Sequence, residues 1–173
     1  GVTGARLDAD ALLARRDAWV SHYDDAGQVA WASGAGLTPI RGHGRLVGER
    51  RVVVEGPDGR RELTARHAVV LASGSVPMVP DAYRDVGAWG SRDATGIQEV
   101  PGSIAVVGGG VVATEAATWL AALGSRVTLL VRGPALLAGV EPFAGELVAA
   151  GLREAGVDVR FGVEATGVHR PET

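Results

Sequence analysis

The sequence contains neither cysteine nor lysine. Without cysteine, this chain cannot supply a disulfide, a thiolate metal ligand or a cysteine nucleophile. All 17 basic residues are arginine, so no lysine is present to form a covalent adduct with a carbonyl substrate. Any thiol or lysine chemistry must therefore come from outside these 173 residues.

The sequence also lacks a strong excess of one charge and a long apolar run. The formal net charge is −3, and acids and bases are spread evenly, so no basic face favours nucleic acid or an anionic membrane. No apolar run approaches the roughly 18 residues that span a bilayer, and no signal peptide is visible. We expect no nucleic-acid or membrane partner and a cytoplasmic location. With 46% hydrophobic residues, the chain has enough apolar material for a packed core.

The first hundred residues predict a helix, short strands and a linker. A helix is expected over 8–32, with Asp8 or Asp10 as its N-cap. Short strands are expected at 37–40, 51–55, 62–65 and 68–73. The last three of these should form an antiparallel set, with "GPDG" as the turn between the first two. Residues 76–100 carry several prolines and glycines and indicate a crossing linker.

After residue 101 the pattern changes to alternating strands and helices. Buried strands are predicted at 103–107, 126–131 and 157–161, with helices at 111–123 and 141–156 between them. Gly124 should end the first helix, and Pro142 should begin the second. This order predicts a β-α-β-α-β unit with a parallel sheet.

The stretch "VVGGGVVATEAA" lies between the first of these strands and the first helix. Gly108, Gly110 and Ala113 spell G-x-G-x-x-A, the pattern with which a dinucleotide pyrophosphate approaches the backbone at a strand-to-helix turn. The free N–H groups at the start of the helix, including those of Val111 and Val112, would bind the anion. The alternative is an ordinary glycine-rich turn.

The residue at the end of the second strand bears on the choice of nucleotide. An acid there binds the ribose 2′-hydroxyl of NAD, whereas an arginine accommodates the 2′-phosphate of NADP. The sequence has Arg132 at this position, and guanidinium forms strong bidentate contacts with phosphate. The pattern therefore favours NADP, with NAD possible. The alternative is a solvated arginine at a strand end.

Three segments together resemble a known family. "VPGSIAVVGGGVVATEAATWLAALGSRVTLLVRG" is similar to the NAD(P)-binding domain of the pyridine nucleotide–disulfide oxidoreductases, which include glutathione reductase, mercuric reductase and dihydrolipoamide dehydrogenase. "IRGHG", which holds His43 and Gly44, is similar to the segment whose backbone meets the FAD adenine. "LTARHAVVLASGSVP" is similar to the second FAD motif of the family and ends in Ala72, Ser73 and Gly74, with serine where the family usually has threonine.

The resemblance implies an α/β fold with two Rossmann-like dinucleotide-binding domains. Residues 1–100 would form a partial FAD domain with an antiparallel meander and the crossing linker, and residues 101–173 a partial NAD(P) domain. The family's first FAD motif, redox-active Cys-x4-Cys, flavin-side lysine and dimerisation domain are not found here. We therefore expect an internal piece of a longer, homodimeric enzyme that is inactive by itself and binds FAD weakly or not at all.

The resemblance also gives roles to two further positions. In the family, the acid at the position of Glu115 reaches the nicotinamide side of the flavin and pairs with the flavin-side lysine, so Glu115 is the candidate catalytic residue. The alternative is a surface glutamate favoured by the dipole at the start of the helix. NADP-specific members often carry a second arginine six residues beyond the first, where this chain has Ala138.

The function implied by the resemblance is that of an FAD-dependent oxidoreductase. Hydride would pass from NADPH to flavin and on to a disulfide or another small-molecule acceptor. One alternative is a flavin-dependent oxidase or ferredoxin reductase, which has both nucleotide motifs and no dithiol. A second alternative is a nucleotide-binding module without turnover. No metal site is predicted.

Overall fold

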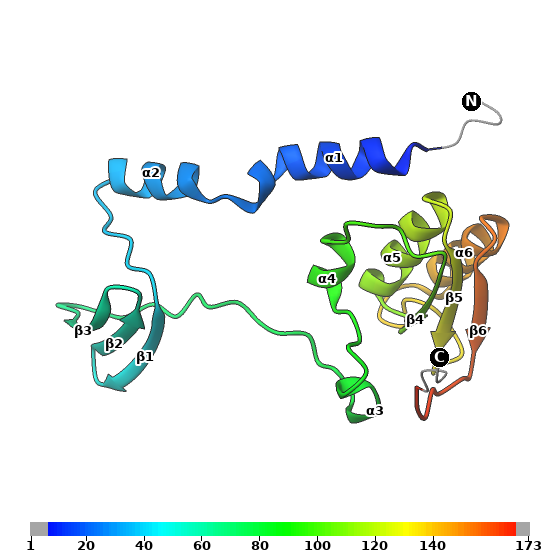
Figure 1. Ribbon diagram of the computed structural model, residues 1–173. Helices are drawn as coiled ribbons and strands as arrows, with labels where there is room; N and C mark the ends of the chain where they lie inside the picture. Colours follow the sequence, from blue (N-terminus) through cyan, green and yellow to red (C-terminus); the bar gives the residue numbers. More distant parts are fainter. Residues whose placement is uncertain (1–6, 169–173) are drawn as a thin grey trace. The chain divides into compact units, whose positions relative to one another are not determined.

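The computed structural model describes residues 7–168, and the chain divides into two compact units (Figure 1). The larger unit contains the chain up to Arg16 and from Pro77 onward, and the smaller unit is Asp17–Val76. The domain boundary at residue 100, which the sequence analysis placed between the expected FAD and NAD(P) domains, stays a prediction. Each unit is described by itself.

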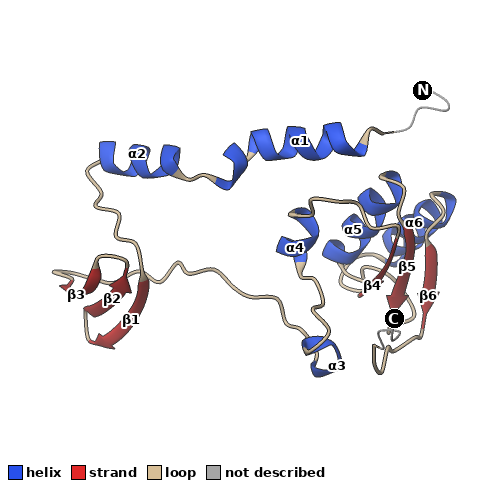
Figure 2. Ribbon diagram, viewed as in Figure 1, coloured by secondary structure: helices blue, strands red, loops and turns tan. Residues whose placement is uncertain are grey.

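The larger unit contains a parallel sheet covered by two helices (Figures 1 and 2). The strands are β4 (Ser103–Val107), β5 (Arg126–Val131) and β6 (Asp158–Phe161), in the order β4-β5-β6. The connecting helices are α5 (Val111–Ala122) and α6 (Pro142–Glu154). α5 packs against α6 on one face of the sheet. This is the arrangement expected when two successive right-handed crossovers run in the same direction. The predicted β-α-β-α-β unit is confirmed.

The core of this unit lies between β5 and the two helices. Alternate side chains of β5 point into it, and Val127, Leu129 and Val131 are all buried. From α5, Ala117 and Leu120 are likewise buried. Small alanine side chains allow the helix to approach the strand closely, and this approach places the start of α5 against the ends of β4 and β5.

The ends of the helices follow from local sequence, as predicted. Gly124 has a φ of +100°, a conformation that glycine adopts without strain. It ends α5 with the N–H of Ser125 donating to the carbonyl of Leu120 at 3.0 Å, the closing bond of a Schellman motif. Pro142 occupies the start of α6, where its missing N–H leaves no hydrogen bond unmade.

The predicted single helix over residues 8–32 was wrong, because the structure has two helices. α1 (Ala9–Trp19) begins after Asp8, whose carboxylate accepts a hydrogen bond from the N–H of Ala11 at 3.0 Å, as expected of an N-cap. α1 and α2 (Ala26–Gly34) are separated by a short 3-10 turn, η1 (Ser21–Tyr23). All three residues of η1 have positive φ angles, between 51° and 62°, and a right-handed helix cannot continue through them.

Within the larger unit, α1 is fixed by one apolar and one polar contact. Leu13 is buried in the same core as Ile97. The guanidinium of Arg16 donates to the carbonyls of Thr95 and Ile97 at 3.0 and 2.6 Å. Thr95 ends α4 (Ser91–Thr95). The predicted linker contains this helix and α3 (Asp81–Arg84).

The smaller unit contains an antiparallel meander of β1 (His43–Gly48), β2 (Arg51–Gly56) and β3 (Gly59–Thr64). The predicted strand at 51–55 and the turn at 56–59 are confirmed, with Gly56 opposite Gly59. The predicted set was wrong in its third member, because residues 43–48 and not 68–73 complete the sheet.

The two other expected strands are extended segments without a partner. Residues 37–40 and 68–73 belong to neither sheet among the described residues. Val70 and Leu71 are 83% and 72% exposed. A strand exists only where a neighbour satisfies its N–H and C=O groups, and local sequence does not reveal whether that neighbour is present.

The helices in the described part of the chain are short. The longest of them, α6, has 13 residues, and none has the length and apolar character needed to cross a membrane.

Candidate nucleotide-binding site

The first glycine of the motif makes the turn at the end of β4. Gly108 has a φ of +136°, which a residue with a side chain adopts only under strain. Its N–H donates to the carbonyl of Leu130 at 2.9 Å and thereby joins the turn to the end of β5. A Cβ at Gly108 would lie 3.4 Å from the Cβ of Ala113, so the third motif position must carry a small side chain.

Gly110, the last of the three glycines, leaves space free at the start of α5. It is the N-cap residue, with extended backbone angles (φ −89°, ψ −179°) and no side-chain cap. An added Cβ would meet nothing within 4 Å. The N–H groups of Val111, Val112 and Ala113, in the first turn of α5, have no acceptor within the helix. The first intrahelical bond is donated by the N–H of Thr114 to the carbonyl of Gly110 at 3.1 Å. Free N–H groups, the positive end of the helix dipole and open space together form a site for an anion.

The middle glycine has a role that the sequence motif did not assign. A Cβ at Gly109 would lie 2.8 Å from Cγ1 of Val131, so a side chain is excluded by packing against β5. The carbonyl of Gly109 accepts a hydrogen bond from the N–H of Leu137 at 2.7 Å. The run of three glycines was the signal for this role, since the motif itself requires only two.

Arg132 lies at the same edge of the sheet as the glycine turn. β4 and β5 are parallel, with Val107 opposite Leu130, so both strands end together and the turn lies beside the end of β5. The side chain of Arg132 is exposed. Within residues 7–168 it has no hydrogen-bond or ion-pair partner, and its guanidinium is available to a phosphate.

Glu115 lies on the exposed side of α5, within about one turn of the free N–H groups. The opposite side of the helix, with Ala113, Thr114 and Ala117, is buried. Val111 and Val112 beside it are 58% and 62% exposed. Glu115 is exposed in the described part of the chain, and its catalytic role stays a prediction.

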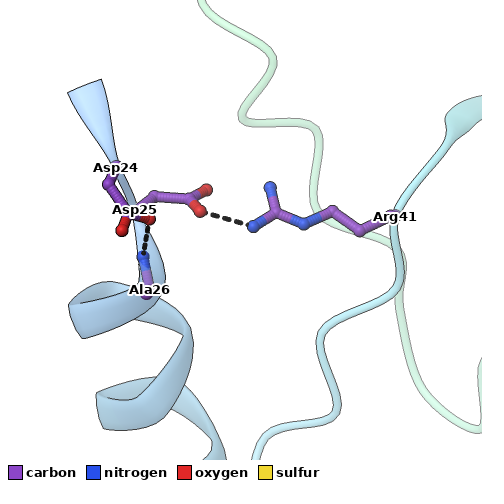
Figure 3. Close-up of polar contacts among 4 residues, drawn as sticks. All are labelled: Asp24, Asp25, Ala26 and Arg41. Carbon is purple, nitrogen blue, oxygen red and sulfur yellow. Dashed lines mark hydrogen bonds and ion pairs between the residues drawn. The ribbon is translucent and has the colours of Figure 1, made fainter. Parts of the chain in front are cut away.

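The segment that resembles the adenine-binding region lies in the smaller unit. His43 and Gly44 begin β1, and the segment before them is joined to α2 by an ion pair between Arg41 and Asp25 at 2.6 Å (Figure 3). The hydrogen bond from the Arg41 guanidinium lowers the pKa of the Asp25 carboxyl from its ordinary value. The pair therefore contributes to stability above the ordinary carboxyl pKa and is lost as the pH falls through the lowered one, although exposed pairs contribute little.

Two glycines fix the backbone of this segment. Gly42 has a φ of +148°, and an added Cβ would lie 2.5 Å from the carbonyl oxygen of Glu55. A Cβ at Gly56 would lie 2.1 Å from the carbonyl oxygen of Arg41. The "IRGHG" backbone is thus packed against the end of β2, a contact that the sequence analysis did not anticipate.

The segment that resembles the second FAD motif has no regular structure. Ala72, Ser73 and Gly74 lie in the segment after β3, and Gly74 has a φ of +73°. Among the described residues no hydrogen bond joins these three to β1. That they converge with His43 and Gly44 on an adenine stays a prediction.

Comparison with known proteins decides the family. The profile of the pyridine nucleotide-disulphide oxidoreductases matches residues 15–173. The chain belongs to this family. Its members use a flavin and a pyridine nucleotide, and the resemblance found in the sequence is confirmed.

Individual relatives support the same assignment. The chain is 32% identical over 169 residues to a mercuric reductase of Shigella flexneri. The aligned region covers 96% of this chain and 30% of the relative. It is also 36% identical over 123 residues to a dihydrolipoyl dehydrogenase of Bacillus subtilis. That aligned region covers 69% of this chain and 26% of the relative. The chain thus spans about a third or less of the length of these relatives.

A solved structure confirms the fold. The Cu(II) complex of the HOCl-induced flavoprotein disulfide reductase RclA of Escherichia coli matches with a TM-score of 0.79 and 23% identity, over 95% of this chain and 38% of the other. The predicted α/β, Rossmann-like fold class is therefore correct.

Proposed function

We propose that this chain is an internal part of an FAD-dependent oxidoreductase that takes hydride from NADPH. The nicotinamide supplies a hydride, which is two electrons and one proton, and the flavin accepts it and passes the electrons to an acceptor. The residues of this chain bind and orient the two nucleotides. Its membership of the family and the short span relative to its relatives support this proposal.

The observation that carries the proposal is the open, uncapped start of α5. Gly110 offers no side-chain cap, and the space at its Cβ position is open. The pyrophosphate of a dinucleotide fits such a place, because its charge satisfies the free N–H groups of Val111, Val112 and Ala113. The residues present therefore fit the nucleotide.

We further propose NADP as the preferred nucleotide, through Arg132. Its exposed guanidinium lies at the end of β5, at the sheet edge that carries the glycine turn. The 2′-phosphate of NADP is the group that distinguishes it from NAD, and a free arginine at this edge complements its charge.

For FAD, we propose that His43 and Gly44 meet the adenine through their backbone and that Ala72, Ser73 and Gly74 complete the same site.

Glu115 is proposed to face the flavin and nicotinamide, where its negative charge would attract a cationic group of the parent protein. Its carboxylate is then buried and paired in the full-length protein, in contrast to its exposure in this unit.

The final acceptor is proposed to be a disulfide or another small molecule. This chain has no cysteine, so a redox dithiol must be contributed by another part of the protein. On the family resemblance alone, we propose a cytoplasmic homodimer for the parent protein. No nucleic-acid or membrane partner is proposed.

The proposal is tested by mixing the full-length protein with NADPH in the absence of oxygen and following the flavin absorbance. We expect NADPH to bleach the flavin. In Glu115→Gln the rate of bleaching should fall at least about tenfold while the Kd for NADPH stays unchanged, because the lost charge leaves its partner unpaired. Glu146→Gln, an exposed glutamate on α6, is the matched control and should behave as the wild type.

Each outcome has a distinct meaning. A protein that contains no flavin, or whose flavin is not reduced by NADPH or NADH, would contradict the proposed function. When oxygen or a disulfide is then added to the reduced protein, reoxidation of the flavin by oxygen and never by a disulfide would indicate the oxidase alternative instead.

A further inference from the structure

The loop between β5 and α6, residues 132–141, is hydrogen-bonded to the glycine turn. The N–H of Leu137 donates to the carbonyl of Gly109 at 2.7 Å. The side chain of Leu136 is 2% exposed and helps to fill the space beside the turn. Leu137 has a φ of +51°, an uncommon conformation for a residue with a side chain, so this position is held by its surroundings.

The other side of the same peptide group faces α6. A Cβ at Gly145 would lie 2.3 Å from the carbonyl oxygen of Leu136 and 3.2 Å from its carbonyl carbon. Both atoms belong to the backbone, so no flexible side chain can move aside. Gly145 is buried in the first turns of α6.

These two contacts are mechanically linked because the peptide bond is planar. The C=O of Leu136 and the N–H of Leu137 point in opposite directions from one rigid plane. That plane is therefore enclosed between Gly145 on one side and Gly109 on the other. A displacement of the Leu136 oxygen therefore also displaces the N–H of Leu137.

The loop cannot absorb such a push by shifting as a whole, because its base is fixed. The N–H of Gly162 donates to the carbonyl of Gly133 at 3.2 Å, and the N–H of Val163 donates to the carbonyl of Val131 at 3.1 Å. These bonds hold the last residue of β5 and the second residue of the loop to the segment that follows β6. We therefore expect a displacement of the Leu136 carbonyl to reach the glycine turn through the N–H of Leu137.

We propose that Gly145 is a positioning residue for the pyrophosphate-binding turn. Its missing side chain lets the Leu136–Leu137 peptide lie against α6 and hold the carbonyl of Gly109 in place. This inference rests on the proposed function, in which the free N–H groups after Gly109 bind the pyrophosphate. Gly145 then contributes to the nucleotide affinity although it does not contact the ligand.

The consequence differs from that of a change at Arg132. The pyrophosphate is common to NADPH and NADH, so a displaced turn weakens both by the same factor. Hydrogen bonds lose strength as their distance and angle depart from the optimum, and several bonds to the pyrophosphate would be affected together.

The test compares Gly145→Ala with Gly151→Ala in the full-length protein. Gly151 lies in the same helix, and an added Cβ there meets nothing within 4 Å. In Gly145→Ala we expect the Kd for NADPH and the Kd for NADH each to rise at least about fivefold, with an unchanged ratio, because the N–H groups are misaligned. In Gly151→Ala both Kd values should stay at the wild-type level.

The contrary results are also distinct. A lower Tm for Gly145→Ala with wild-type Kd values would show a merely structural glycine and overturn the inference, while leaving the proposed function intact. Absence of nucleotide binding in the wild type would instead overturn the proposed function itself, and this inference with it.

Amide hydrogen exchange on the wild-type protein keeps the inference testable if Gly145→Ala does not fold. The Leu137 amide should exchange more slowly when NADPH is bound, because the ligand holds the turn that accepts its hydrogen bond. An exchange rate of Leu137 that NADPH leaves unchanged would contradict the coupling.

Discussion

Gly110→Val is expected to abolish nucleotide binding and leave the fold intact. The backbone of Gly110 is extended, at a φ of −89°, and its Cβ direction is open, so a valine fits without strain or collision within the chain. The free energy of unfolding should therefore change little. This separates Gly110 from Gly108 and Gly109, where a side chain meets a positive φ or the side chain of Val131.

Binding is lost because the valine side chain of Gly110→Val fills the open space at the start of α5. The two methyl groups of valine would lie in front of the free N–H groups at the start of α5 and keep the pyrophosphate from reaching them. Charge-assisted hydrogen bonds contribute about 1.5–3 kcal/mol each, and about 1.4 kcal/mol corresponds to a factor of ten. Losing two of them raises the Kd for NADPH by at least about a hundredfold.

Gly102→Val is the matched control for this substitution. Gly102 precedes β4 at the opposite end of the strand, and an added Cβ there also meets nothing within 4 Å. Both variants should keep the Tm of the wild type, and only Gly110→Val should lose NADPH, as measured by titration calorimetry on the full-length protein. Retained affinity in Gly110→Val would mean that the glycine turn is not the binding site.

Arg132→Glu is expected to shift the preference from NADPH toward NADH by at least about tenfold, since a charge-assisted phosphate contact is worth about 1.5–3 kcal/mol. The two nucleotides differ only in the 2′-phosphate, so a residue that recognises this group changes their ratio and not both affinities equally. A glutamate also repels the phosphate, which adds to the effect of the lost contact. The exposed, unpartnered position of Arg132 means that its replacement breaks no interaction in the described part of the chain.

The measurement is kcat/KM for NADPH and for NADH in the full-length enzyme. Arg126→Glu reverses the same charge at the other end of β5, where the side chain is also exposed, and should leave the ratio unchanged. If Arg132→Glu gave the wild-type ratio, Arg132 would be a solvated residue at a strand end, and the preference for NADP would lose its basis.

The part of the fold that the sequence predicted well is the part in which local signals agree. In the β-α-β unit, strand, glycine turn and helix follow one another within a few residues, and each boundary has its own marker, such as Gly124 or Pro142. The positions of Gly108 and Arg132 at one sheet edge then follow from parallel pairing alone. Periodicity and turn chemistry were sufficient here because no distant contact competes with them.

Elsewhere the deciding interaction is not local. Apolar spacing continues through residues 8–32, and nothing in the sequence of Ser21–Tyr23 marks three left-handed residues, since no glycine is present. Residues 68–73 have strand composition, but a strand also needs a neighbour. The contact between Gly145 and Leu136 joins a helix to a loop through the backbone, and the sequence does not distinguish Gly145 from Gly151 of the same helix.

The most direct test of the central claim is the position of NADPH in a crystal structure of the full-length protein. The account predicts pyrophosphate oxygens within hydrogen-bonding distance of the N–H groups of Val111 and Val112, directly above Gly110. A pyrophosphate bound away from the start of α5 would contradict it.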